Sequence, residues 1–149
     1  MLIVEPAHPM DPAPRALLKQ SHDLMQQLFM PEDNFFFGFD ALCSPDVYFV
    51  TARDGAEMLA TGALVQMEGY CEIKSMFTSA KARRRGAGAA ILRALEDHAR
   101  NLGFTRLRLE TGAALESAIR LYERQGFTRC ARFGDYTPNE VSVYMEKSI

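Results

Sequence analysis

The chain has 149 residues, the length of one domain, and its 48% hydrophobic and 24% charged residues are typical of a soluble globular protein. Its formal net charge of −2 argues against general affinity for nucleic acid. No apolar run approaches the ~20 residues that span a bilayer, and the N-terminus lacks the cationic start and long apolar core of a signal peptide. We therefore expect a cytoplasmic protein with no membrane and no nucleic-acid partner.

The hydrophobic pattern predicts a single α/β domain over residues 1–149, a mixed sheet covered by helices. Asp54-Gly55 between two alternating runs predicts a hairpin, and Gly103 stands where a helix would end. The expected elements, in chain order, are a strand at 2–7, a Pro-rich loop, a helix at 14–29, an irregular Phe-rich segment at 31–42, strands at 47–53, 58–65 and 71–78, a glycine loop and its helix, a strand at 105–111, a helix at 115–125 and two last strands.

The run Arg-Arg-Arg-Gly-Ala-Gly at residues 83–88 lies between the expected strand 71–78 and the amphipathic helix that follows. A glycine turn that opens a helix leaves several backbone N–H groups unpaired at the positive end of the helix dipole. Such a turn can bind a phosphate or pyrophosphate. The neighbouring cations favour a polyanionic ligand, although a charge run of this kind is also commonly a solvated surface.

The spacing of this run excludes two common phosphate motifs. A P-loop would carry Lys-Ser or Lys-Thr after its last glycine, whereas Ala89-Ala90 stands there. A dinucleotide fingerprint needs G-x-G-x-x-G, and only the first two glycines are present. The remaining pattern, Arg-x-x-Gly-x-Gly from Arg83 to Gly88, is short and on its own would also fit a plain helix start.

A second pattern lies further along the chain, where Ala118, Leu121, Tyr122, Gly126 and Phe127 form Ala-x-x-Leu-Tyr-x-x-x-Gly-Phe. Together with Arg-x-x-Gly-x-Gly, this pattern resembles the GNAT family of N-acetyltransferases. The resemblance implies the GNAT fold, a central mixed and mostly antiparallel twisted sheet flanked by helices, in which the loop strand and the next strand splay apart. It also implies acetyl-CoA as co-substrate without a metal, and a small-molecule amine or amino-compound as acceptor. A homodimer is compatible with this interpretation.

By this resemblance, the loop would hold the pyrophosphate of coenzyme A through backbone N–H groups. The backbone of Met76 and Thr78 would bond to the pantetheine arm, with the Met76 N–H near the thioester carbonyl. A donor so placed stabilises a developing oxyanion by about 2.7–4 kcal/mol, although Met76 would also fit as a packing residue. The expected cofactor-binding residues are Met76, Phe77, Thr78, Arg83, Arg84, Arg85, Gly86, Ala87, Gly88 and Ala89.

Glu72 is the candidate base. Strand alternation places Glu72 on one face with Lys74, Met76 and Thr78, and directs Ile73 with Phe77 into the core. In several GNAT enzymes a glutamate at this place on the strand deprotonates the amine, which cannot attack while it is protonated. An ion pair between Glu72 and Lys74, its neighbour on the same face, is an equally good interpretation.

Tyr122 is the candidate acid. In the family this tyrosine points its hydroxyl at the coenzyme sulfur, where it would stabilise the leaving thiolate. Its helical spacing with Leu115, Ala118 and Ile119 also fits a core residue on an apolar stripe. Many family members carry an asparagine where this chain has Leu115, so we do not expect that pantetheine contact here.

The resemblance further implies that the acceptor enters between the first helical region, here residues 32–37, and the last two strands, of which residues 133–136 would be the first. Both segments hold aromatic and acidic side chains suited to a small amine. Cys71 should not form an acyl-enzyme, because it faces away from Glu72 and has no histidine near it in sequence. The three cysteines are odd in number and form no C-x-x-C, so neither a disulfide framework nor a zinc site is expected.

Two other functions remain open at this point. A non-catalytic, acyl-CoA-binding regulatory module would need the loop at residues 83–88 but neither Glu72 nor Tyr122. A nucleotide-phosphate protein is disfavoured because the Lys-Ser/Thr pair and an evident acidic metal site are both missing.

Overall fold

Seven strands form one sheet in the order β1-β2-β3-β4-β5-β7-β6 in the computed structural model, which describes residues 1–149. All neighbouring pairs are antiparallel except β4 and β5, which are parallel. This confirms the predicted mixed, mostly antiparallel α/β sheet. The strands are β1 (Leu2–Pro6), β2 (Val47–Asp54), β3 (Glu57–Gln66), β4 (Cys71–Thr78), β5 (Arg106–Gly112), β6 (Thr128–Arg129) and β7 (Ser142–Ser148).

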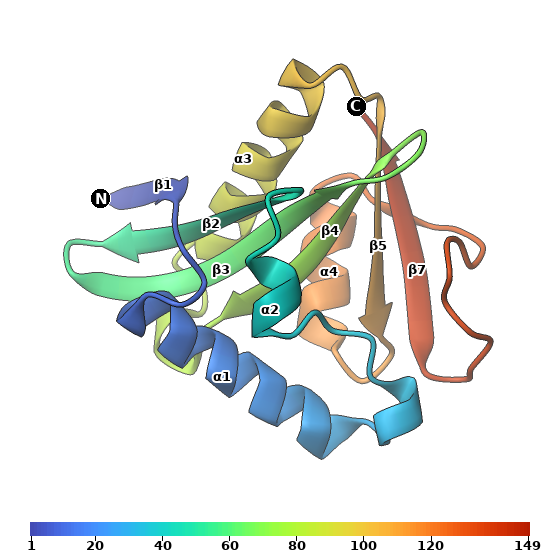
Figure 1. The fold of residues 1–149 in the computed structure, drawn as a ribbon, viewed down its shortest axis with the longest axis horizontal. Helices are drawn as coiled ribbons and strands as arrows, with labels where there is room; N and C mark the ends of the chain where they lie inside the picture. Colours follow the sequence, from blue (N-terminus) through green and yellow to red (C-terminus); the bar gives the residue numbers. More distant parts are fainter.

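Helices cover both faces of the sheet, with α1 and α2 on one face and α3 and α4 on the other (Figure 1). Two short 3-10 turns, η1 and η2, complete the helical elements. None of the helices combines the length and apolar content that crossing a membrane requires. The bounds are α1 (Pro12–Leu28), η1 (Pro31–Asp33), α2 (Phe39–Leu42), η2 (Ala80–Ala82), α3 (Ala87–Asn101) and α4 (Glu116–Arg124).

Strand alternation divides the buried side chains between the two faces. Leu64 on β3 belongs to a cluster that includes Ile91 and Leu95 of α3. Its neighbour Ala63 belongs to a separate cluster with Leu18 of α1. Because both faces of the central strands are covered, β2 and β3 are largely apolar runs, and the sequence located each of them within one residue.

The sheet opens between its two parallel strands. β4 and β5 pair only from Cys71↔Leu107 to Ile73↔Leu109, although each strand continues for several residues beyond that point. Beyond Ile73, β4 remains paired with β3 alone, and β5 with β7. The expected splay therefore begins at Ile73, and it leaves one edge of β4 without a strand partner.

A β-bulge in β4 corrects the predicted alternation. Lys74 pairs with Ala63 and Phe77 with Thr61, so Gly62 alone faces two residues, Ser75 and Met76. Ser75 has a positive φ of 55°. A bulge re-aims the side chains that follow it, and Met76 accordingly packs against the same core cluster as Ile73, on the α3 face. The prediction that Met76 shares a face with Glu72 was wrong.

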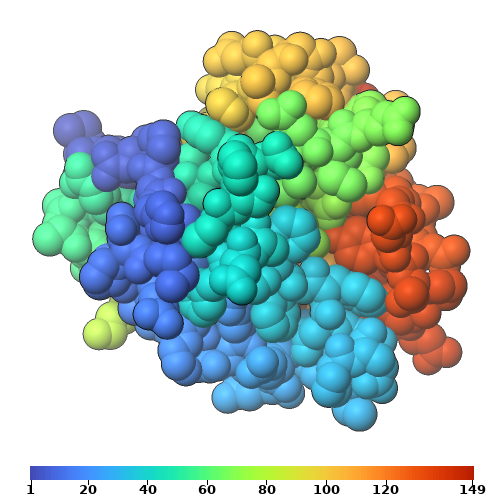
Figure 2. Space-filling view, in the orientation of Figure 1, coloured from blue at the N-terminus to red at the C-terminus, as the bar shows by residue number.

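The end of the chain also differs from the expectation. Residues 133–136 were expected to form the first of two closing strands. They lie instead in the irregular segment between β6 and β7, where Gly134 has a positive φ of 60°. Figure 2 shows this C-terminal region meeting the Phe-rich segment after α1 on one face of the molecule. The two segments expected around the acceptor therefore lie side by side, although neither is a strand.

Candidate active site

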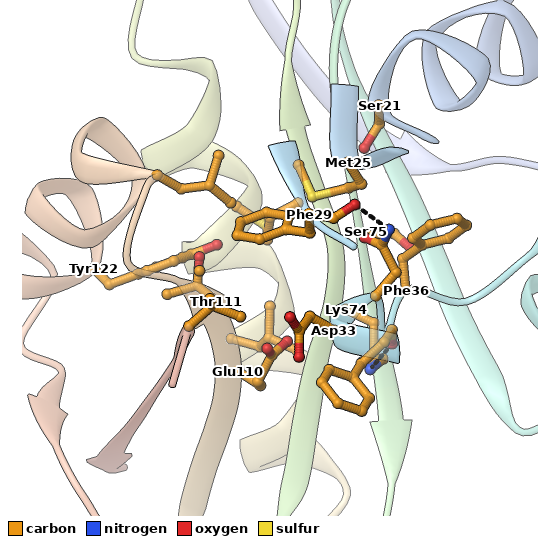
Figure 3. Close-up of a pocket in the computed structure, with 17 residues that line it drawn as sticks. Ser21, Met25, Phe29, Asp33, Phe36, Lys74, Ser75, Glu110, Thr111 and Tyr122 are labelled. Atoms are coloured by element: carbon orange, nitrogen blue, oxygen red, sulfur yellow. Dashed lines mark hydrogen bonds between the residues drawn. The ribbon is translucent and has the colours of Figure 1, made fainter. Parts of the chain in front are cut away.

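A cavity of about 100 Å³ lies at the point where β4 and β5 separate (Figure 3). Its walls come from the second half of α1, the Phe-rich segment, β4, β5 and α4 with its N-cap. The polar lining side chains are Ser21, Asp33, Asn34, Lys74, Ser75, Glu110, Thr111 and Tyr122, and the apolar ones include Met25, Phe29, Phe35, Phe36, Ile73, Met76, Leu115 and Val141.

The glycine loop opens α3 as the sequence predicts. Gly86 is the N-cap of α3 with a φ of 79°, and no side chain caps the helix. Arg84, two residues earlier, also has a positive φ, of 67°. The first backbone N–H groups of a helix have no intrahelical acceptor, and those of Ala87 and Gly88 are the first two of α3. This end of α3 is therefore free to bind an anion through its backbone.

The three arginines of the loop are not equivalent. Arg85 forms ion pairs with Glu57 at 2.6 Å and with Asp54 at 2.9 Å, both at the β2–β3 hairpin. Arg83 and Arg84 are exposed and form no ion pair. The charge available to a ligand at the loop therefore comes mainly from Arg83 and Arg84, while Arg85 attaches the loop to the hairpin.

Close packing connects the loop with the cavity. A Cβ added to Gly88 would lie 2.8 Å from Leu121 Cδ2 and 3.6 Å from Thr78 Oγ1. Leu121 is followed on α4 by Tyr122, and Thr78 lies two residues after Met76 on β4. Both Tyr122 and Met76 line the cavity. The loop therefore packs against β4 and α4, the two elements that carry Met76 and Tyr122 to the cavity.

Tyr122 is buried, with 5% of its surface exposed, and packs edge-on against Phe127 with the ring centroids 5.9 Å apart. Its hydroxyl points into the cavity, beside Thr111 (Figure 3). Burial, and next the charge of Glu110, raises the pKa of Tyr122 well above the ordinary phenol value. The side chain is thus a core residue with a protonated hydroxyl at the cavity wall.

Glu72 is buried and already has partners. The hydroxyl of Tyr136 donates a hydrogen bond to its carboxylate, and Lys74 Nζ lies 3.6 Å from Glu72 Oε2. The predicted ion pair with Lys74 is therefore present. Glu72 itself does not line the cavity, whereas Lys74 does. The structure places the candidate base next to the cavity, within a network of hydrogen bonds.

Lys74 links this network to the Phe-rich segment. Its ammonium donates to the carbonyl oxygen of Phe35 at 3.0 Å and to the Tyr136 hydroxyl at 2.7 Å, and it lies 4.8 Å from the ring centroid of Phe37. The Lys74 side chain is 9% exposed. One buried lysine therefore joins β4 to both segments that flank the expected acceptor position.

Glu110 on β5 is a candidate that sequence reasoning missed. It lines the cavity and accepts a hydrogen bond from Ser142 Oγ at 2.7 Å. Desolvation by burial raises its pKa above the ordinary value. The local sequence Arg106-Leu107-Arg108-Leu109-Glu110 reads as a strand with one solvated face, so only the splay of β4 from β5 identifies Glu110 as a cavity residue.

Cys71 is fully buried, and burial raises the pKa of its thiol to about 11. A thiol with so high a pKa is a poor nucleophile. No group of three or more His, Cys, Asp or Glu side chains is arranged to hold a metal ion.

Comparison with known proteins supports an acetyltransferase activity. A model of the acetyltransferase (GNAT) family matches residues 15–127. An IAA acetyltransferase from Azospirillum brasilense is 34% identical over 143 residues, which cover 95% of this chain and 94% of the relative. The N-acetyltransferase YsnE of Bacillus subtilis, which is uncharacterised, is 36% identical over 137 residues, covering 90% and 91% of the two chains.

Solved structures have the same fold. A crystal structure described as an acyl-CoA N-acyltransferase from Klebsiella pneumoniae is 30% identical with a TM-score of 0.83, covering 99% of this chain and 97% of that one. A more distant acetyltransferase from Elizabethkingia anophelis, 15% identical with a TM-score of 0.69, covers 99% and 98% and was crystallised with acetyl-CoA bound.

Proposed function

The chain belongs to the GNAT family of N-acetyltransferases, whose co-substrate is acetyl-CoA, and we propose that it moves the acetyl group to the primary amine of a small molecule. The amine attacks the thioester directly in a ternary complex. The observation that supports this best is the cavity between β4 and β5, which Tyr122 and Glu110 line and beside which the glycine loop packs against Leu121 of α4 and Thr78 of β4. No cysteine lines the cavity, and Cys71 of β4 is fully buried, which favours direct attack over an acyl-enzyme on cysteine.

In this proposal the pyrophosphate of coenzyme A binds the start of α3, where Gly86, Ala87 and Gly88 bring free N–H groups close to the ligand. The pantetheine arm follows the open edge of β4. Beyond Ile73 no strand pairs with that edge, so its backbone groups are available to the amides of the arm. The bulge at Ser75 and Met76 interrupts the β3–β4 ladder beside the cavity, which supports the Met76 N–H as a donor to the thioester carbonyl.

Tyr122 stabilises the departing thiolate. Its hydroxyl points into the cavity, and its raised pKa keeps it protonated. A phenol is a weaker acid than a thiol, so complete proton transfer to sulfur is unfavourable. A hydrogen bond that strengthens as negative charge develops on sulfur describes the proposed role.

The amine loses its proton to Glu110 at the cavity wall, or through water to Glu72 beside the cavity. Glu110 lines the cavity, and its raised pKa brings it closer to that of a base suited to neutral pH. Glu72, the base nominated by the sequence, lies near enough to raise the pKa of Glu110 through its charge. In Glu72→Gln or Glu110→Gln, turnover should recover as the pH rises and more amine is already deprotonated.

Two measurements test the proposal. Isothermal titration should detect binding of coenzyme A and no comparable binding of ATP. Release of free thiol from acetyl-CoA should depend on an added primary amine and should be absent with the matching N-acetylated amine. A protein that binds coenzyme A and releases no thiol with any amine would instead be a non-catalytic acyl-CoA-binding module.

A further inference from the structure

We propose that the acceptor is a primary amine with an apolar or aromatic body and without a carboxylate beside its nitrogen. This inference rests on the proposed acetyl transfer and concerns the acceptor side of the same cavity. Its basis is the balance between charged groups that remain available to a ligand and those that are already engaged within the protein.

The cavity has one cation among its lining side chains, and that cation is engaged. Lys74 has three ammonium protons. Two bond to the Phe35 carbonyl oxygen and the Tyr136 hydroxyl, and Glu72 lies 3.6 Å away as the counter-ion. With its side chain 9% exposed and its charge balanced by Glu72, Lys74 has at most one ammonium proton left for the carboxylate of a ligand.

The carboxylates of the cavity outnumber its cation. Asp33 and Glu110 both line it, from η1 and β5, and Figure 3 shows both side chains at the cavity wall. Asp33 forms no ion pair, and the partner of Glu110 is the neutral hydroxyl of Ser142. An incoming ammonium would be attracted by these two groups, and a carboxylate next to it would be repelled by them.

The rest of the lining is apolar. The rings of Phe29, Phe35 and Phe36 lie on the acceptor side of the cavity with Met25 of α1. These rings pack against other parts of the protein. His22 stacks on Phe36 with centroids 4.6 Å apart, and the Phe29 ring covers Gly112, where an added Cβ would come within 2.1 Å of it. A wall of packed aromatic rings favours an apolar or aromatic body next to the ammonium.

A matched pair of amines tests the inference. Phenethylamine and phenylalanine share the same ring and spacing and differ by the carboxylate beside the nitrogen. Initial rates of thiol release from acetyl-CoA give kcat/KM for each. We expect phenethylamine to exceed phenylalanine by at least about 100-fold, since like-charge juxtaposition in a recognition site costs several kcal/mol. An equal or greater kcat/KM for phenylalanine would overturn the inference and leave acetyl transfer itself intact.

A variant locates the selectivity in the cavity. Asp33→Asn should raise the KM for phenethylamine several-fold, reduce its advantage over phenylalanine and leave the KM for acetyl-CoA unchanged. Glu32→Gln is the matched control, because Glu32 is the exposed neighbour of Asp33 on η1 and does not line the cavity. Equal effects of the two variants would contradict a role for Asp33 in the cavity.

A peptide with a free N-terminus and a polyamine are tested as acceptors beside the two phenyl compounds, and the four form the amine panel. If one of them is acetylated and neither phenyl compound is, the acceptor class is wrong and the proposed function stands. If no amine releases thiol from acetyl-CoA that is demonstrably bound, the proposed function fails together with the inference.

Discussion

The hydroxyl of Tyr136 donates a hydrogen bond to the carboxylate of Glu72, which lies 64 residues earlier in the chain. The same hydroxyl accepts a hydrogen bond from Lys74 at 2.7 Å. One phenol therefore connects the segment between β6 and β7 with the two buried charges of β4, and through Lys74 with the Phe-rich segment.

Removing this hydroxyl should weaken the fold around the cavity. In Tyr136→Phe, the buried Glu72 and Lys74 each lose a partner, and we expect about 1–3 kcal/mol less stability in urea unfolding. Tyr48→Phe is the control, because Tyr48 stacks on His98 and its hydroxyl makes no hydrogen bond within the protein. Equal stability of the two variants would mean that the hydrogen bonds of the Tyr136 hydroxyl contribute little to the free energy of unfolding.

Tyr122→Phe separates packing from chemistry, since it keeps the ring and its contact with Phe127. If the hydroxyl stabilises the leaving thiolate, kcat should fall roughly 10- to 100-fold, the worth of a hydrogen bond to a charged group. The Kd of coenzyme A, measured by calorimetry, should stay similar. Turnover at the wild-type rate, with an amine for which the chemical step is rate-limiting, would reduce Tyr122 to a packing residue.

Glu110→Gln should stabilise the protein, increasingly so as the pH rises. Burial raises the pKa of Glu110 in the folded state, so the folded protein binds this proton more tightly than the unfolded chain does. The wild type therefore loses stability as the pH rises through that raised pKa, and glutamine has no charge to bury. Melting temperatures from pH 4 to pH 8 should show a growing advantage of Glu110→Gln. The exposed Glu68→Gln should show none, and a pH-independent difference for Glu110→Gln would contradict the account.

Two glycines with similar backbone geometry test whether the glycine loop binds the pyrophosphate of coenzyme A. Gly86 and Gly69 both have a positive φ, 79° and 86°, and an added Cβ at either would meet nothing within 4 Å. Valine should therefore introduce similar backbone strain at both positions. Only Gly86→Val should lose affinity for coenzyme A in calorimetry, because only Gly86 lies at the proposed pyrophosphate site. Comparable affinities in the two variants would place the coenzyme elsewhere.

Much of this arrangement is local and was therefore readable from the sequence. The strand at residues 71–78, the glycine loop and the tyrosine of α4 each depend on short-range spacing, and the structure has them where the patterns indicate. The ion pairs of Arg85 could not be predicted in this way, because its partners Asp54 and Glu57 lie about thirty residues earlier in the chain, at the β2–β3 hairpin. A run of three arginines does not indicate which of them a distant acid engages.

The misplaced residues all depend on pairing between distant segments. Met76 faces α3 because β3 supplies only Gly62 opposite two residues of β4. Glu110 enters the cavity because β5 leaves β4 after Leu109. Neither the bulge nor the splay can be recognised from the neighbouring sequence. A bulge depends on how many residues the partner strand supplies, and a splay depends on where the pairing of two strands ends.

The most direct test of direct attack in a ternary complex is a two-substrate kinetic analysis with acetyl-CoA and phenethylamine, or whichever amine the panel identifies. Initial rates at several fixed concentrations of each substrate should give intersecting double-reciprocal lines, and acetyl-CoA alone should leave the mass of the protein unchanged. Parallel lines, together with one acetyl group on Cys71 formed at a catalytically competent rate, would contradict the account.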